Sequence, residues 1–204
     1  MSQHIVVVGA TGTQGRGIVQ SLLPQWPIQA LTRDPNSPSA QSLLSDFQTP
    51  DNRLSLVTGH VYDKASLVKA FKGAHGVFVM TSERYPWKVL TEESEMKHEL
   101  EAGRNLIEAA RECGVEHFVF SSLPDVVEAS GGRFVNVHHM NNKHEIEVLA
   151  RGELDCFTGL IPGEYRTQLT RGGRLVVADC IKASFIIICS GLSIHDFKVR
   201  TVME

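Results

Sequence analysis

The sequence has little of what marks several large classes of protein. Its longest apolar stretch, residues 185–192, is less than half of the roughly 20 residues that a membrane-spanning helix needs, and it is typical of a buried strand. Neither sign of charge dominates, because 20 Lys and Arg residues stand against 23 Asp and Glu residues, a net charge of −3. A disordered acidic tail or a basic coat for nucleic acid would be unbalanced. We therefore expect a globular protein with no membrane association and no direct nucleic-acid binding.

Cysteine is also scarce, and it is scattered. The four residues Cys113, Cys156, Cys180 and Cys189 make no CxxC pair, which argues against zinc clusters and redox dithiols and favours reduced, packed thiols. We expect no signal peptide either, because a strand-like run at 4–8 leaves no room for a charged segment followed by an apolar one. We expect a cytoplasmic protein.

What the sequence does contain is a regular alternation of β-rich runs and helical periods, which is typical of stacked βαβ units. The predicted strands are 4–8, 28–32, 54–58, 76–80, 117–121 and 155–161, and the predicted helices are 13–23, 39–47, 64–72, 91–113 and 136–151. Continuously apolar strands indicate a sheet that is covered on both faces. The expected fold class is therefore α/β, a doubly wound parallel sheet of the Rossmann type.

A glycine-rich turn follows the first predicted strand directly and opens a helix. Its sequence, GATGTQG at residues 9–15, places three glycines at intervals of three. Small residues let the backbone turn tightly and approach a pyrophosphate, whose charge meets the N–H groups at the helix start. A turn that merely connects strand to helix is the alternative. We expect dinucleotide binding, with these residues contacting the cofactor: Gly9, Thr11, Gly12, Thr13, Gln14 and Gly15.

The end of the second predicted strand bears on the choice of cofactor. NAD-preferring proteins usually carry an acidic residue there for the ribose 2′-hydroxyl, whereas this chain has Arg33, which can pair with a 2′-phosphate. A solvated arginine is the alternative, and the neighbouring Asp34 would repel a phosphate if it pointed inward. The expected cofactor is NADP(H).

Several strings, taken in order along the chain, resemble the NmrA-like family of atypical short-chain dehydrogenase/reductase relatives, many of them fungal. They lie at residues 9–15, 31–34, 59–67, 76–81, 113–123, 137–147 and 157–163. The resemblance implies an NADP-binding Rossmann domain, with Thr81 and Lys143 among the cofactor-binding residues. It also implies either an oxidoreductase of secondary metabolism or an NADP-sensing transcriptional co-regulator.

The resemblance has limits that shape the expected domain organisation. His60 stands where the family commonly has Asp beside the adenine, and Ile161 where an arginine often precedes Pro-Gly. Members usually continue for roughly another 100 residues into a small substrate or partner domain, as two-part α/β proteins do. We therefore expect an NADP-binding domain over 1–165 and a divergent, truncated or remodelled C-terminal segment over 166–204.

Ordinary short-chain dehydrogenases use a Ser, a Tyr, and a Lys four residues after the Tyr. The corresponding helix here has His139 and Lys143, and a spacing of four puts both side chains on one helical face. Ser122, or its neighbour Ser121, would stand near them at the end of the fifth strand. A neutral imidazole, favoured by a nearby lysine, could perform acid/base chemistry without a tyrosine. Alternatively, His139 is a surface or packing residue and Lys143 only holds the cofactor ribose.

Metal and hydrolase chemistry are not expected. His139 and His144 are five residues apart, which is poor for one helical face, and HExxH and GxSxG motifs are both missing. The favoured function is an NADPH-dependent oxidoreductase, or a cyclase- or isomerase-type acid/base enzyme, acting on a small oxygenated metabolite. The alternative is a non-catalytic NADP(H)-sensing regulator that binds a protein partner. A homo-oligomer is left open.

Overall fold

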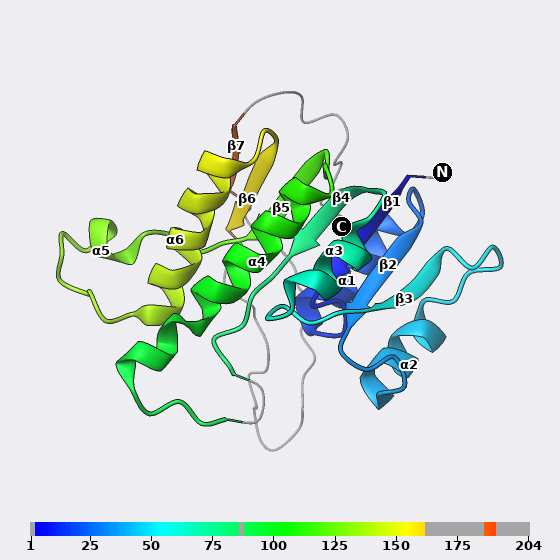
Figure 1. Ribbon diagram of the computed structural model, residues 1–204, viewed down its shortest axis with the longest axis horizontal. Helices are drawn as coiled ribbons and strands as arrows, with labels where there is room; N and C mark the ends of the chain where they lie inside the picture. The colour runs from blue at the N-terminus through cyan, green and yellow to red at the C-terminus, as the bar shows by residue number, and fades with distance from the viewer. Residues whose placement is uncertain (1–2, 86–87, 162–185, 191–204) are drawn as a thin grey trace, which may run out of the picture.

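The computed structural model describes residues 3–85, 88–161 and 186–190 of the chain (Figure 1). Its strands are β1 (His4–Val8), β2 (Ile28–Thr32), β3 (Leu54–Thr58), β4 (Ala74–Val79), β5 (His117–Ser121), β6 (Phe157–Ile161) and β7 (Ile186–Ser190). Its helices are α1 (Thr13–Leu22), α2 (Pro38–Asp46), α3 (Lys64–Phe71), the 3-10 helix η1 (Glu93–Lys97), α4 (His98–Glu112), α5 (Val126–Ala129) and α6 (His138–Glu153).

All seven strands form one sheet in the order β3-β2-β1-β4-β5-β6-β7. The first six are parallel and β7 pairs antiparallel with β6. The chain winds outward from β1 to β3 and then returns to place β4 on the other side of β1. This reversal is the topological switch point at which open α/β sheets bind ligands, beside the carboxyl ends of the strands.

Each face of the sheet has its own buried core, because successive residues of a strand point to opposite faces. On one face, Val6 and Val8 of β1 pack with residues of α3, α4 and α6. On the other face, Ile5 and Val7 pack with residues of α1 and α2. Figure 1 shows α4 and α6 lying side by side across the first face. The doubly wound α/β prediction is therefore confirmed.

The predicted element boundaries differ from the observed ones where local hydrogen bonds decide them. The single helix predicted over 91–113 is divided into η1 and α4, because Glu92 and Glu95 form a capping box that starts a 3-10 turn before α4 begins. The fourth strand begins at Ala74, two residues before its predicted start. The short helix α5 was not predicted, and the Asp125 side chain caps it by accepting from the Glu128 N–H.

The predicted C-terminal segment 166–204 lies outside the described residues except for β7, which falls on the apolar run that was predicted to be a strand. The domain division at residue 165 therefore stays a prediction. In the described part of the chain, Cys113 carries a free thiol, and burial, aided by the Glu112 carboxylate, raises the pKa of Cys113.

Candidate cofactor and acid/base site

The glycine-rich turn lies at the switch point, between the end of β1 and the start of α1. Gly9 has φ +78, a left-handed conformation that favours glycine. A Cβ at Gly15 would lie 2.1 Å from the Gly9 carbonyl oxygen, so no side chain fits between the turn and the helix. Gly12 differs, because a Cβ there would lie 3.5 Å from its nearest neighbour, an ordinary contact. The protein itself therefore requires glycine at positions 9 and 15, whereas position 12 is open toward any ligand.

The first turn of α1 has the features of an anion-binding helix start. Gly12 is the N-cap residue and has no side chain to bond the first amides, and the first turn carries no acidic residue. The first N–H groups of a helix have no partner within it, and the helix dipole makes this end positive. Gln14 ties the turn to the end of β5, because its Nε2 lies 2.8 Å from the Ser121 hydroxyl.

The two candidate serines differ in what they face. The Ser121 hydroxyl contacts both polar atoms of the Gln14 side chain, which places it beside the glycine-rich turn. Ser122 is 1% exposed, and its hydroxyl donates to the Leu123 carbonyl at 3.4 Å. Of the two, Ser121 is therefore the one that the structure connects to the candidate cofactor site.

The segment after β2 presents Arg33 on the surface. Its neighbour Asp34 is engaged within its own turn, where its Oδ1 accepts from the Asn36 N–H at 2.8 Å and its backbone carbonyl accepts from the Ser37 hydroxyl. One oxygen of the Asp34 carboxylate is thus held within the turn that precedes α2.

Lys143 is held in a buried network that joins α6, α4 and the end of β4. Its ammonium donates to the Thr81 carbonyl at 2.9 Å, to the Thr81 hydroxyl at 2.8 Å and to Glu99 Oε1 at 2.8 Å. The Thr81 hydroxyl in turn donates to the same Glu99 oxygen at 2.6 Å. The Lys143 side chain is 8% exposed and Glu99 is 0% exposed. All three ammonium hydrogens therefore have partners within the protein.

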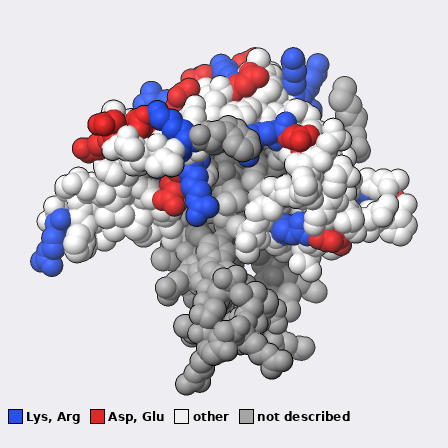
Figure 2. All heavy atoms as spheres, turned by 90° about the horizontal axis from the view of Figure 1, so that it is seen from below, with Lys and Arg blue, Asp and Glu red and all other residues white. Residues whose placement is uncertain are grey.

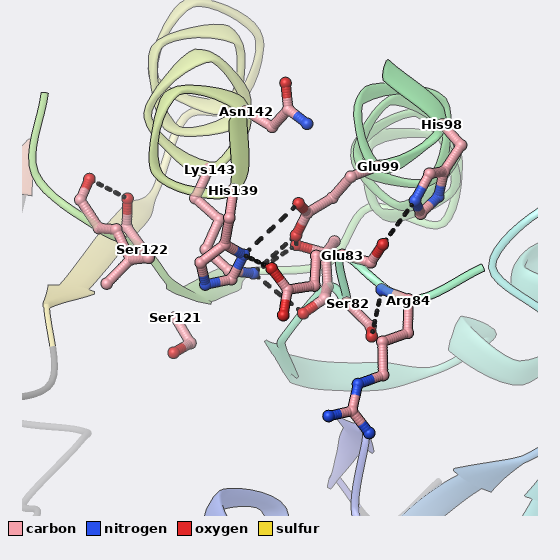
Figure 3. Close-up of polar contacts among 12 residues, drawn as sticks. Ser82, Glu83, Arg84, His98, Glu99, Ser121, Ser122, His139, Asn142 and Lys143 are labelled. Atoms are coloured by element: carbon pink, nitrogen blue, oxygen red, sulfur yellow. Dashed lines mark hydrogen bonds and ion pairs between the residues drawn. The ribbon is translucent and has the colours of Figure 1, made fainter. Parts of the chain in front are cut away.

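His139 lies one turn before Lys143 on α6, and carboxylates face it. Its Nδ1 is 3.6 Å from Glu83 Oε2 and 4.0 Å from Glu99 Oε2. In Figure 3, His139 and Lys143 project from α6 toward Glu99 on α4, and the other ring nitrogen of His139 points away from the carboxylates. From the sequence we expected a lysine and a serine beside this imidazole, and the two carboxylates add negative charge to those expected surroundings.

A second polar chain fixes the segment that carries Glu83. His98 Nε2 donates to the Glu83 carbonyl at 2.9 Å, and its Nδ1 accepts from the Tyr62 hydroxyl at 2.5 Å. Tyr85 stacks on Tyr62 with ring centroids 5.1 Å apart. Burial, together with Tyr85, Glu101 and Glu99, raises the pKa of Tyr62 to about 12, so this phenol remains a hydrogen-bond donor at neutral pH.

Glu83, Glu99 and the Thr81 hydroxyl bridge were missed by the sequence analysis, yet one signal was available. Glu99 occupies the same helical stripe as Ala102, Gly103 and Leu106, all of which are buried. Lys143 shares the stripe of Ile146, Glu147 and Ala150 in the same way. Charged residues in the buried stripes of two helices, Glu99 on α4 and Lys143 and Glu147 on α6, indicate buried ion pairs, because a lone buried charge is too costly.

The other two histidines of α6, His138 and His144, contact different carboxylates. His138 Nε2 lies 3.9 Å from Glu93, and His144 Nε2 lies 3.5 Å from Asp125. Among the described residues, no group of three or more His, Cys, Asp or Glu side chains could hold a metal ion. Within the same part of the chain, no helix is both long and apolar enough to cross a membrane.

Figure 2 shows that charges of both signs are mixed on the described part of one face of the molecule. Lys and Arg side chains lie among Asp and Glu side chains, and neither sign forms a continuous field there. An anionic ligand on this face would therefore be recognised by local groups and not by a general attraction.

The sheet order, the helix layers and the glycine-rich turn at the switch point define a Rossmann-type α/β protein. The model of the NmrA-like family matches residues 1–171, and the chain belongs to this family. The family resemblance inferred from the sequence is thus confirmed.

Two fungal relatives illustrate the match. The chain is 36% identical over 170 residues to the NmrA-like family domain-containing oxidoreductase FrzB of Cladobotryum sp, covering 81% of this chain and 47% of that protein. It is 36% identical over 152 residues to the oxidoreductase hkm9 of Aspergillus hancockii, covering 72% of this chain and 41% of that protein. The chain therefore spans about half the length of the curated relatives that it matches.

Solved structures with the same fold include two enzymes in complex with nicotinamide cofactors. The Citrobacter sp. triphenylmethane reductase complexed with NADP(H) has a TM-score of 0.61 at 22% identity, covering 80% of this chain and 50% of that one. The Escherichia coli NADPH-dependent quinone oxidoreductase with NADPH has a TM-score of 0.59 at 23% identity, covering 79% and 49%. At this identity the likeness shows a shared fold.

Proposed function

We propose that the chain binds NADP(H) at the switch point and forms the cofactor-binding part of an NADPH-dependent oxidoreductase. The geometry of residues 9–15 carries this proposal. Gly9 and Gly15 are needed by the turn itself, while Gly12 leaves open space at an uncapped helix start without acidic residues. That combination fits a pyrophosphate, which needs close backbone approach and free N–H groups. The contacting residues would be Gly9, Thr11, Gly12, Thr13, Gln14 and Gly15.

The preference for the 2′-phosphate is assigned to Arg33, since Asp34 is engaged in its own turn. We assign Thr81 and Lys143 to contact with the nicotinamide ribose. Because the Lys143 ammonium has three partners already, contact with the ribose requires the exchange of one of them. The solved relatives with NADPH or NADP(H) and the oxidoreductase names of the curated relatives support the cofactor and the reaction class.

The acid/base group of the proposed site is His139, with Ser121 or Ser122 and Lys143 beside it. NADP(H) would supply or accept a hydride at a carbonyl or hydroxyl carbon of a small oxygenated metabolite. His139 is suited to give or take the proton on the substrate oxygen, because imidazole exchanges protons near neutral pH. Its side chain is 40% exposed, which leaves it accessible from the site.

A regulator that senses NADP(H) without turnover is the second candidate function. It is favoured by two observations: the position of the tyrosine in ordinary short-chain dehydrogenases is occupied by His139, and Lys143 is engaged by a buried glutamate. Such a protein would bind the cofactor through the same turn and present a surface to a protein partner.

Cofactor consumption separates the two functions. The purified chain is incubated with NADPH and a panel of carbonyl and quinone compounds, and the absorbance of the reduced nicotinamide is followed. The oxidoreductase is expected to consume NADPH with at least one compound, whereas the regulator binds NADPH and consumes none. Binding itself is measured by calorimetric titration, and a chain that folds but does not bind NADPH contradicts both.

The role of His139 is tested by His139→Phe, with His138→Phe as the matched control. General acid/base groups contribute about 10²- to 10⁴-fold to rates, so the first variant should lose turnover by that order while it keeps NADPH affinity. His138 faces Glu93 at 3.9 Å and lies outside the proposed site, so its variant should keep both. Full turnover by His139→Phe would eliminate this mechanism.

A further inference from the structure

Two buried polar atoms face one another across a short gap. Glu99 Oε2 and His139 Nδ1 are buried, and neither has a hydrogen-bond partner among the described residues. They lie 4.0 Å apart. Buried polar atoms are nearly always hydrogen-bonded, because an unpaired one loses its interactions with water and gains nothing. Each of these atoms is therefore a candidate partner for the other, because the imidazole N–H can donate to the carboxylate oxygen once the 4.0 Å gap between them shortens.

Glu99 is a better partner than Glu83, although Glu83 is nearer at 3.6 Å. The Glu99 carboxylate is 0% exposed, and its Oε1 is fixed by donors from Lys143 and Thr81. Its second oxygen therefore has a single orientation. The Glu83 side chain is 58% exposed, so water competes for its oxygens and the side chain can turn away.

We propose that Glu99 is the positioning residue for His139, and that its Oε2 accepts the His139 Nδ1–H. A carboxylate only accepts hydrogen bonds, so this contact requires the Nδ1–H tautomer. The lone pair then stands on Nε2, the nitrogen that points away from the carboxylates in Figure 3. This orientation would give the acid/base role of His139 in the proposed function a defined nitrogen, and the inference rests on that function for its significance but not for its test.

The protein contains its own reference for the opposite tautomer. His98 Nε2 lies 2.9 Å from the Glu83 carbonyl, which can only accept, and His98 Nδ1 faces the Tyr62 hydroxyl at 2.5 Å. His98 is therefore an Nε2–H tautomer. The two histidines should give opposite patterns in one spectrum.

The test is nitrogen NMR of the full chain labelled with ¹⁵N-histidine, at a pH at which both rings are neutral. His139 and His98 are assigned from the spectra of His139→Gln and His98→Gln. The expected result is Nδ1–H for His139 and Nε2–H for His98. A native His139 in the Nε2–H form, or in a mixture without preference, overturns the proposal. Because the tautomer is measured in the native chain, this result does not depend on whether a Glu99 variant folds.

Glu99→Gln sharpens the test because it should invert the tautomer. Lys143 and Thr81 are donors, so they hold the amide oxygen at the Oε1 position and leave the NH₂ group facing His139. A donor there needs a lone pair on Nδ1, and His139 should change to Nε2–H. Glu83→Gln is the matched control and should keep Nδ1–H. If only Glu83→Gln changes the tautomer, Glu83 and not Glu99 positions the ring.

The tautomer measurement and the turnover measurement can fail independently of one another. Loss of turnover in His139→Phe bears on the reaction and says nothing about the tautomer. Conversely, an Nδ1–H tautomer in a chain that consumes no NADPH leaves the positioning role of Glu99 intact and removes only its use in catalysis.

Discussion

Lys143 and Glu99 form a buried ion pair in which each group compensates the desolvation of the other. Removing one partner of such a pair leaves a buried charge uncompensated, which typically costs about 3–5 kcal/mol. Replacing both partners by apolar residues of similar volume is often neutral or stabilising. A buried pair of this kind is therefore weak evidence for net stability, although breaking it by removing one partner is costly.

This reasoning predicts the stabilities of a variant series. Lys143→Met should lower the free energy of unfolding by about 3–5 kcal/mol, whereas Lys143→Met combined with Glu99→Met should recover most of the loss. Urea unfolding monitored by circular dichroism measures both. A double variant as unstable as the single one would show that the Thr81 hydrogen bonds, and not the unpaired carboxylate, determine the loss.

Arg33 allows a prediction about cofactor choice. Charge-assisted hydrogen bonds contribute about 1.5–3 kcal/mol, which corresponds to roughly 10- to 100-fold in affinity. We expect NADPH to bind more tightly than NADH by that order, and Arg33→Ala to remove most of the difference while it leaves NADH affinity unchanged. Calorimetric titration of the native chain and the variant with both cofactors is the measurement. Equal native affinities would contradict the assignment.

At the scale of elements, the glycine-rich turn separates the requirements of folding from those of binding. Gly15 packs against the Gly9 carbonyl, whereas Gly12 has room on the protein side. Substitution of these two glycines should therefore have different effects on folding. The difference arises because the first turn of α1 packs against the end of β1 at Gly15 but not at Gly12.

The prediction for this element uses both positions. Gly12→Val should leave the chain folded, because a Cβ at this position meets nothing closer than 3.5 Å, but it should abolish NADPH binding, since the added side chain fills the space of the pyrophosphate. Gly15→Ala should instead destabilise the fold itself. Thermal unfolding and NADPH titration of the two variants make the comparison. Retained binding by a folded Gly12→Val chain would show that the cofactor lies elsewhere.

The two helices of the site, α4 and α6, bring together charged residues that lie far apart along the chain. α4 and α6 pack on one sheet face, and each carries a charged residue in its buried stripe at the end that lies near the carboxyl end of β4. Thr81, which follows β4, joins the two charges. The network therefore assembles only when all three elements have packed.

At the scale of the whole molecule, alkaline pH should weaken the fold through Tyr62. Burial raises the pKa of Tyr62 from 10.0 to about 12, so the folded state resists ionisation of this phenol. The sign follows from linkage: the contribution is fully present below the unfolded pKa of 10.0 and is lost as pH rises through about 12. Urea unfolding across that range should show falling stability, with a smaller fall in Tyr62→Phe. Equal falls would exclude Tyr62 as the cause.

Much of the molecule follows from local patterns in the chain. The strands 4–8, 28–32, 54–58 and 117–121 were predicted with the bounds that the structure shows, because short β-rich runs between turn residues and helical periods mark strands of βαβ units. The glycine-rich turn was placed at the start of α1 for the same reason. Family membership followed from the order of such motifs along the sequence.

The candidate acid/base site depended on packing across the fold. The spacing of His139 and Lys143 placed them on one helical face, but Glu99 is more than 40 positions from Lys143 in the chain, and Glu83 is brought to His139 by the bonds of His98. Charge pairing between distant segments has no local periodicity, since it arises when a parallel sheet gathers the ends of its strands at one edge. The partners of Lys143, and the carboxylates that face His139, were therefore decided by the way α4, α6 and β4 pack together.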